Sequence, residues 1–233
     1  MNVSEPRTLP EWTAQLLSDI AHVTHEQISR FAKPPDSARE AAVLVLLRDV
    51  GQGPETLLLT RSPALKAHAG QVAFPGGSVD ADDEDIVATA LREATEETTL
   101  HAAVLHPHLV WPKLWIPVSG FAVTPVFAWC SHDGAIESRD DEDEVVQVHS
   151  VTLAELSNPA HRSRVRYPNG AHGPAFDVDG LFVWGFTALV LDRLLHFAGF
   201  EEPWSSQLDI VLPSATPSPP DSLGPAVEDE VSP

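Results

Sequence analysis

The chain has 233 residues, with 14 Lys and Arg against 34 Asp and Glu, and its formal net charge is −20. Such a charge repels phosphate backbones and anionic lipid surfaces, which excludes nucleic acids and membranes as expected partners. The single cysteine, Cys130, excludes an intramolecular disulfide, and the sequence contains no signal peptide or membrane-length apolar run. We therefore expect a cytoplasmic protein.

The predicted elements follow a simple order along the chain. Residues 1–35 form an N-terminal helical extension, with a helix predicted over 11–31 and a break at Pro34 and Pro35. The elements predicted after it are strands over 41–47 and 56–60, an acidic helix, a strand over 121–129 and a helix over 184–197. This alternation indicates an α/β layer sandwich with a mixed sheet over 36–200. We expect the tail, 201–233, to be largely disordered, because it is rich in proline and acids and offers little apolar surface.

The acidic helix carries Glu93, Glu96 and Glu97, which share one flank at about 100° per residue. No lysine lies between them to offset their repulsion, so a bound cation would supply that relief. Mg²⁺ or Mn²⁺ suits carboxylate oxygens that also face substrate phosphates. A separate face packs inward through the following residues: Val87, Ala90, Leu91, Ala94 and Thr98.

An acidic run alone is more often a solvated helix face than a metal site. The turn just ahead of it, with Gly76 and Gly77, changes this interpretation, because glycine lets the backbone approach a diphosphate closely. Turn and helix together predict a metal and pyrophosphate site.

The stretch from Gly77 to Leu100 resembles the Nudix box, in which a glycine and a glutamate precede Arg-Glu-apolar-any-Glu-Glu-any-Gly-apolar. Counting back from Arg92 gives Glu84 as the first glutamate, whereas counting forward from the glycine gives Asp83, so the loop holds one extra residue. A second departure is Thr99, which stands where the family has glycine. A β-branched residue tolerates the left-handed conformation of a helix end badly, so the helix end is expected to differ.

The resemblance implies a Nudix-like α/β/α sandwich with a mixed β-sheet and a metal-dependent diphosphatase. It implies that Glu93, Glu96 and Glu97 are metal ligands, and that Glu96 or Glu97 also takes part in catalysis. Arg92 is expected to orient Glu84 or a neighbouring loop.

A separate general base is suggested by the acidic run 140–144. The family often has a glutamate before a strand at this place, and Glu144 matches it ahead of Val145. The rest of the run is interpreted as a solvated loop.

A second signature lies directly upstream, from Leu57 to Gly77, and resembles the motif of coenzyme A pyrophosphatases within the Nudix superfamily. Leu59 stands where threonine is usual, and Lys66 where arginine is usual, which keeps the charge but loses the bidentate fork. The alternative interpretation of the cations here is a solubilising pair at a strand end. The resemblance implies substrate contacts from the following residues: Arg61, Ser62, Lys66, Gly70, Phe74, Gly76 and Gly77.

Other candidates have weaker signals. His68 could contact phosphate or ribose, although a lone histidine is more often structural. Trp111, Trp115 and Phe121 could stack on adenine or line a pantetheine channel, although such aromatic residues more often pack in a core.

Three functions remain open from the sequence. The first is a diphosphatase of coenzyme A or acyl-coenzyme A, which would give adenosine 3′,5′-bisphosphate and 4′-phosphopantetheine or its acyl form. The second is a Nudix hydrolase of another nucleoside diphosphate derivative, such as ADP-ribose, NADH or a damaged nucleotide. The third is a catalytically weak Nudix module that binds a ligand. A homodimer is compatible with each of them.

Overall fold

The computed structural model describes residues 9–62, 70–139, 145–205 and 209–212 of the chain. The elements in chain order are α1 Glu11–Ile20, α2 His25–Ile28, β1 Arg39–Asp49, β2 Pro54–Arg61, β3 Val72–Ala73, β4 Gly76–Ser78, α3 Ile86–Glu97, η1 Ala102–Val104, β5 Leu105–Val110, β6 Leu114–Ile116, β7 Phe121–Cys130, β8 Val145–Thr152, α4 Leu153–Ser157, η2 Pro159–His161, β9 Arg162–Arg166, β10 His172–Val178, β11 Leu181–Trp184, α5 Gly185–Phe197 and β12 Asp209–Val211.

The main sheet is built around β1. Its central path runs β3-β2-β1-β7-β5, while β4 pairs with β1, β6 with β7 and β8 with β2. β1 lies parallel to β7 and antiparallel to β2 and β4, so the sheet is mixed. The strands predicted over 41–47, 56–60 and 121–129 are β1, β2 and β7, each extended by one or two residues at its ends.

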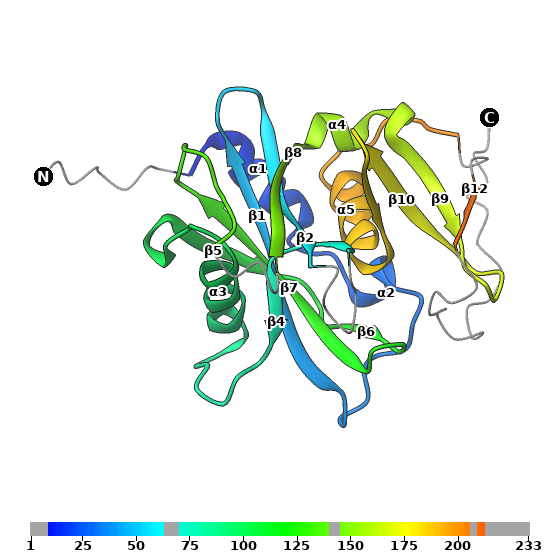
Figure 1. Ribbon diagram of the computed structural model, residues 1–233, viewed down its shortest axis with the longest axis horizontal. Coiled ribbons are helices and arrows are strands. Elements are labelled where there is room, and N and C mark those ends of the chain that lie inside the picture. Colours follow the sequence, from blue (N-terminus) through cyan, green and yellow to red (C-terminus); the bar gives the residue numbers. More distant parts are fainter. Residues whose placement is uncertain (1–8, 63–69, 140–144, 206–208, 213–233) are drawn as a thin grey trace, which may run out of the picture.

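Each face of this sheet is covered by helices (Figure 1). Alternate β1 residues point to opposite faces, so Leu44 and Leu46 pack with α3 residues Ala90 and Ala94 in one core. Val45 and its alternates enter the other core together with residues of α1, α2 and α5. The two cores confirm the α/β/α sandwich.

The N-terminal segment departs from the prediction of one helix over 11–31. α1 ends at Ile20, and α2 starts after Thr24, whose backbone N–H donates to the Gln27 side chain at 2.8 Å. Thr24 with Gln27 three residues later is a capping pattern that starts a new helix, and this signal was overlooked. Both helices bury side chains in the core that contains α5, so this extension is part of the same domain.

A second sheet, in the order β11-β10-β9-β12, packs on the other side of α5 (Figure 1). It was not predicted. Its last strand, β12, lies within the segment 201–233 that is expected to be largely disordered. β12 pairs in parallel with β9, and Leu212 is buried against Val165. The remainder of the predicted tail, 213–233, lies outside the described residues.

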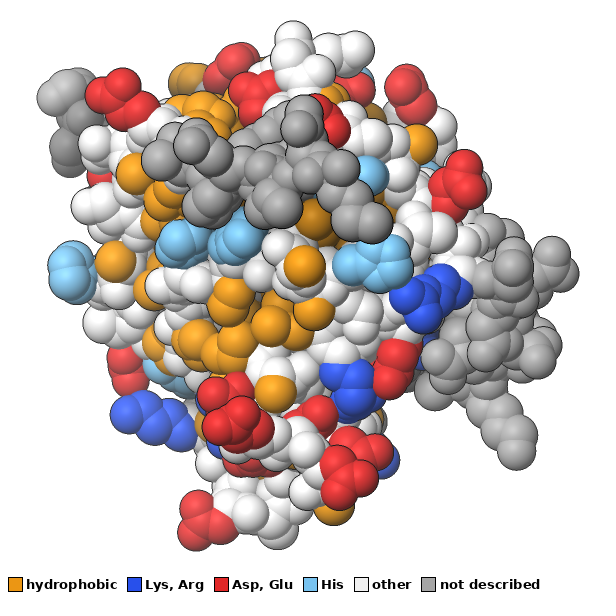
Figure 2. Space-filling model, turned by 90° about the vertical axis from the view of Figure 1, so that its left-hand side faces the viewer, with side chains coloured by type: hydrophobic (Ala, Val, Ile, Leu, Met, Phe, Trp, Pro, Cys, Tyr) orange, Lys and Arg blue, Asp and Glu red, His pale blue; other side chains and the backbone are white. Residues whose placement is uncertain are grey.

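The surface reflects the composition. On the face seen in Figure 2, acidic side chains surround a central region of hydrophobic side chains, and basic side chains are few, in keeping with the net charge of −20. Within the described ranges, no helix has both the length and the apolar character that a membrane crossing needs.

Candidate active site at the glycine turn and the acidic helix

The predicted glycine turn lies against the central strand. β4 pairs antiparallel with β1, which sets Gly76 opposite Val43 and Gly77 opposite Ala42. A Cβ added to Gly76 would lie 2.7 Å from Val43 Cα, and Gly76 has a φ of 158°. A Cβ added to Gly77 would lie 2.6 Å from Glu93 Oε2. The first glycine is therefore required for strand pairing, and the second leaves room for a carboxylate.

Glu97, in the last turn of α3, joins the acidic helix to this glycine turn. Its side chain is buried, and Oε2 accepts a hydrogen bond from Gly76 N–H at 2.9 Å. Its other oxygen, Oε1, lies 3.4 Å from Arg61 Nη1 at the end of β2. One carboxylate thus connects the turn, the acidic helix and the cation of the upstream signature.

Arg92 organises the other two glutamates. Its Nη1 donates to Glu93 Oε1 at 2.9 Å and to Glu96 Oε2 at 3.0 Å. Its Nη2 also donates to the carbonyl oxygen of Ser78 at 3.1 Å, just after the glycine turn. The Glu96 side chain remains 57% exposed, so it is the most accessible of the three carboxylates.

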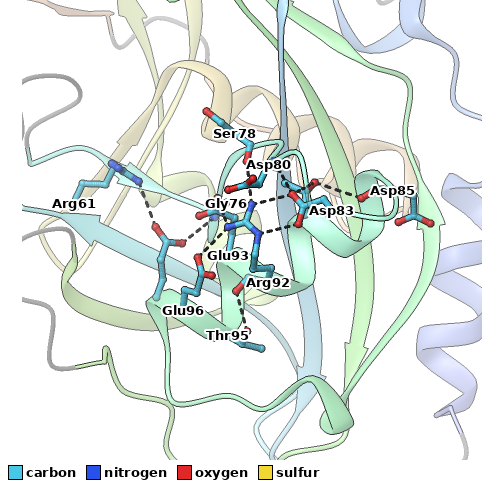
Figure 3. A network of polar contacts seen from close by, with 12 residues as sticks. Arg61, Gly76, Ser78, Asp80, Asp83, Asp85, Arg92, Glu93, Thr95 and Glu96 are labelled. Atoms are coloured by element: carbon cyan, nitrogen blue, oxygen red, sulfur yellow. Dashed lines mark hydrogen bonds and ion pairs between the residues drawn. The ribbon is translucent and has the colours of Figure 1, made fainter.

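In the loop ahead of α3, Asp83 and not Glu84 forms an ion pair with Arg92. Arg92 Nε and Nη2 bind Asp83 Oδ1 and Oδ2 at 2.9 and 3.0 Å, a bidentate pair (Figure 3). Asp83 also accepts hydrogen bonds from Thr89 Oγ1 and from the N–H of Asp80. The Arg92 guanidinium, foremost among these donors, holds the pKa of Asp83 well below its usual range. Of the two alternatives expected for Arg92, Glu84 or a neighbouring loop, its printed contacts are with the loop, through Asp83 and Ser78, and Glu84 is exposed.

Both ends of α3 are fixed by side chains that the sequence motifs do not include. At its start, Asp85 accepts hydrogen bonds from Val87 N–H at 2.9 Å and Ala88 N–H at 2.8 Å. This is a standard N-cap, and an aspartate immediately before the apolar repeat is a signal that could have identified it. Thr89, which also binds Asp83, could have been found from its place one turn before Arg92.

The contacts at the end of α3 explain why Thr99 can stand where the family has glycine. Thr98 forms a bridge with Ser138, and Thr99 N–H donates to Glu137 O at 2.9 Å. In return, Glu137 N–H donates to Thr99 Oγ1 at 3.1 Å, and Arg139 Nε donates to Thr98 O at 3.0 Å. The chain therefore leaves the helix in an extended pairing, for which a β-branched residue is suited.

The carboxylates suit a hard divalent cation in their chemistry. Glu93, Glu96 and Glu97 offer only oxygen, the donor that Mg²⁺ and Mn²⁺ prefer, and the Glu93 carboxylate occupies the space that a Gly77 Cβ would fill. Among the described residues, no group of three or more His, Cys, Asp or Glu side chains is close enough to form a ready-made cage. Mg²⁺ commonly uses one or two carboxylates and completes its shell with water and substrate phosphates, so the residues present fit such an ion.

Residues of the upstream signature meet at the base of a loop. Arg61 N–H donates to Gln71 O at 3.0 Å, and Gly70 N–H donates to Arg61 O at 3.1 Å. Gly70 has a φ of 68°, which favours glycine. Ser62 is buried, and Phe74 is 2% exposed within the main core, so its side chain supports the turn from below and offers a ligand no surface. Lys66, His68 and the candidate base Glu144 lie outside the described residues.

The aromatic candidates are placed in packing roles. Trp111 is buried, stacks edge-on against Phe127 with ring centroids 4.7 Å apart, and donates its indole N–H to Ile20 O at 3.1 Å. Phe121 lies under the Arg39 guanidinium, 3.9 Å from ring centroid to Cζ. Trp115 is partly buried on β6. These contacts agree with the core alternative.

Comparison with known proteins places this geometry in a family. The family model of the NUDIX domain matches residues 38–168. An uncharacterized Nudix hydrolase named NudL from Pectobacterium atrosepticum is 36% identical over 188 residues, which cover 78% of this chain and 94% of that protein. A relative of the same name from Klebsiella pneumoniae is 39% identical over 163 residues, covering 67% and 81% of the two chains.

Among solved structures, the Nudix hydrolase RenU from M. smegmatis matches with a TM-score of 0.49 and 17% identity, over 78% of this chain and 97% of that one. The sequence matches cover more than half of the chain, and they include the glycine turn, the acidic helix and the strands that position them. This chain belongs to the Nudix hydrolase family.

Proposed function

We propose that this chain hydrolyses the diphosphate bond of coenzyme A or an acyl-coenzyme A, with Mg²⁺ or Mn²⁺ as cofactor. The products are adenosine 3′,5′-bisphosphate and 4′-phosphopantetheine or its acyl form. The observation that carries the proposal is the double contact of Glu97 with Gly76 and Arg61. Arg61 belongs to the coenzyme A-type signature and Glu97 to the Nudix box, so two motifs that were recognised separately share one carboxylate.

In the proposed reaction, water adds to one phosphorus, the bridging P–O bond breaks, and the leaving phosphate keeps the bond's electron pair. Glu93, Glu96 and Glu97 would hold the divalent cation. When bound, it neutralises charge on the diphosphate and lowers the pKa of water. Little covalent chemistry is left to the protein in such a transfer, so its task is positioning and charge stabilisation.

The residues around the glutamates divide this task. Gly76 lets β4 pair closely with β1, and Gly77 leaves the space that the Glu93 carboxylate occupies beside the turn. The contact between Arg61 and Glu97 uses one of the five N–H donors of the guanidinium, and phosphate oxygens are suitable partners for its fork. Arg92 keeps Glu93 and Glu96 on the same side of the helix.

The general base is a choice between two carboxylates. Glu96 is the more exposed of the glutamates in contact with Arg92, which leaves it accessible to water. Glu144 stays a candidate on sequence grounds. The two are separated by measuring turnover of Glu96→Gln and Glu144→Gln variants against pH at saturating metal. The rate rises with pH as the general base loses its proton, so only the variant that lacks the base should change this rise.

A substrate panel tests the proposal. Purified protein is incubated with Mg²⁺ or Mn²⁺ and with coenzyme A, acetyl-coenzyme A, ADP-ribose or NADH, and the products are identified by mass. We expect adenosine 3′,5′-bisphosphate from both coenzyme A substrates. Cleavage of ADP-ribose or NADH with coenzyme A left intact would overturn the substrate assignment. If folded protein cleaves nothing with either metal, the ligand-binding alternative replaces it.

A further inference from the structure

A polar cavity of about 440 Å³ lies on the opposite face of β2 and β8 from α3. Its floor is formed by β2 and β8, and its rim by the start of α4 and the turn between β10 and β11. The side chains that define its chemistry are Thr60, Gln147, His149, Glu155, Asp179 and Leu181. None of the Nudix box residues lines it, so its ligand is not explained by the metal site.

The floor of the cavity offers uncharged hydrogen-bonding groups. Thr60 Oγ1 and His149 Nε2 are 2.7 Å apart on the neighbouring strands β2 and β8. Burial lowers the pKa of His149, so its ring is neutral near pH 7 and can both donate and accept. Gln147 lies two residues before His149 on the same face of β8 and adds an amide.

The rim excludes a phosphate. Glu155 is ionised, since hydrogen bonds from Thr152 lower its pKa, and Asp179 provides a second carboxylate at the hairpin turn. The described residues that line the cavity include neither lysine nor arginine. An anion placed here would face two carboxylates without a cation, which is strongly unfavourable. The ligand group must therefore be uncharged or cationic.

Part of the wall is apolar. Val151, Val178 and Leu181 stand beside the polar groups, and two of them, Val151 and Val178, are buried. A group that carries amides, a hydroxyl and methyl groups would satisfy both kinds of wall. The pantetheine arm has this composition, whereas the adenosine bisphosphate end of coenzyme A brings charged phosphates.

The cavity is also within reach of the diphosphate site. Thr60 lines the cavity, and the next residue, Arg61, contacts Glu97 on the other face of β2. Side chains alternate along a strand, so these consecutive residues face the two places from opposite faces of β2. Pantetheine has the length of roughly four extended residues, or about 13 Å. This is several times the separation of about 3.8 Å between the Cα atoms of two consecutive residues.

We infer that this cavity binds the uncharged, amide-bearing arm of the substrate, so that the arm sets specificity while the diphosphate lies at the glycine turn. The inference rests on the proposed function. It assigns Thr60, His149 and Gln147 as partners of the arm's amide and hydroxyl groups, and Leu181 as a partner of its methyl groups.

The test uses substitutions that fill the cavity, and it measures binding of the arm separately from hydrolysis. Leu181→Trp adds bulk at the rim, and Gln147→Trp adds bulk at an exposed strand position, where substitutions usually change stability little. Val211→Trp, on the exposed edge strand β12, is the matched control. We expect KM for coenzyme A to rise about tenfold or more in both cavity variants, with kcat within a factor of two and the control unchanged, because a blocked subsite loses at least the binding contributed by a few methylene groups.

Binding of pantetheine alone is followed by the NMR resonances of the His149 ring and the Gly180 amide, without metal or turnover. We expect both to shift at millimolar pantetheine in the wild type and in Val211→Trp, and to stay unshifted in Leu181→Trp. If the wild type cleaves coenzyme A but the resonances do not move and KM is unchanged in the cavity variants, the inference is overturned and the proposed function stands. If coenzyme A is not cleaved, the proposed function fails, and the pantetheine titration still decides whether the cavity takes the arm.

Discussion

The carboxylate of Glu97 accepts a hydrogen bond from the backbone N–H of Gly76 at 2.9 Å, across 21 residues of sequence. This bond ties the last turn of the acidic helix to the glycine turn beside β1, and Arg61 approaches the other oxygen of the same carboxylate. The position of the Glu97 side chain is thereby fixed against the main sheet.

Replacement of Glu97 by glutamine should abolish most turnover while the protein stays folded. An amide keeps the size of the side chain and can still accept from Gly76, but it loses the charge needed for a divalent cation. We expect kcat to fall by about 10²–10³-fold, the range seen when one charge-stabilising group is removed. Steady-state kinetics with circular dichroism of the same samples provide the measurement. Glu84→Gln, at an exposed position of the preceding loop, is the control, and equal activity of the two variants would refute the role of Glu97.

Gly76→Ala and Gly77→Ala should fail in different ways. The added methyl group at Gly76 meets the β1 backbone, 2.7 Å from Val43 Cα, so the strand pairing must shift and we expect a stability loss of about 1–3 kcal/mol. At Gly77 the methyl group meets the Glu93 carboxylate, which can rotate away. Metal affinity should then fall more than stability. Thermal unfolding and Mn²⁺ titration followed by electron paramagnetic resonance distinguish the two, and identical profiles would contradict the distinction.

The pairing of Asp83 with Arg92 should appear in the pH dependence of stability. The folded-state pKa of Asp83 lies below its unfolded value of about 3.9, so its stabilising contribution is complete above that unfolded value and is lost as the pH falls through the folded pKa. Asp83→Asn should therefore be less stable than the wild type at pH 7, and the difference should shrink below about pH 4. Urea unfolding of both proteins across this range is the measurement. A difference that stays constant down to pH 2 would show that the charge of Asp83 does not contribute.

Restoring the family's glycine at position 99 should destabilise this protein. Thr99→Gly removes the hydroxyl that accepts from Glu137 N–H and adds backbone freedom to the unfolded chain, so we expect a loss of about 1–2 kcal/mol. Thr99→Ser keeps the hydroxyl and should recover part of the loss. Urea unfolding measures all three proteins, and a gain in stability with glycine would mean that the helix prefers the family's usual end.

The parts that were predicted correctly depend on short-range patterns. Runs and repeats of apolar residues predict β1, β2, β7 and α5. The spacing of these residues reflects the geometry of a strand or a helix, which is set by the local backbone. The carboxylates of α3 share a flank because helical geometry alone decides it. The expected inward face of this helix is also present, with Ala90, Ala94 and Thr98 buried.

The parts that were missed depend on pairing across the chain. Counting residues left Asp83 and Glu84 as alternatives, and only the loop's path toward Arg92 selected Asp83. The strand β12 lies at a short apolar run, Ile210 to Leu212, inside a tail whose overall composition favours disorder, and its pairing with β9 depends on a distant segment. Phe74 belongs to a binding motif in the sequence, yet the sheet turns its ring into the core.

The sequence alone identified the residues that we propose to carry the chemistry: a glycine pair, an arginine and three glutamates at helical spacing. The common flank of the glutamates needs no distant partner, because helix geometry is fixed by neighbours in the chain. Only the tertiary structure decided that Arg61 and Gly76 share Glu97, and that a polar cavity lies behind β2. Those relations arise from strand pairing and from the packing of segments that are far apart in the sequence. Burial of apolar surface drives this packing, and the local spacing of apolar residues does not specify which segments meet.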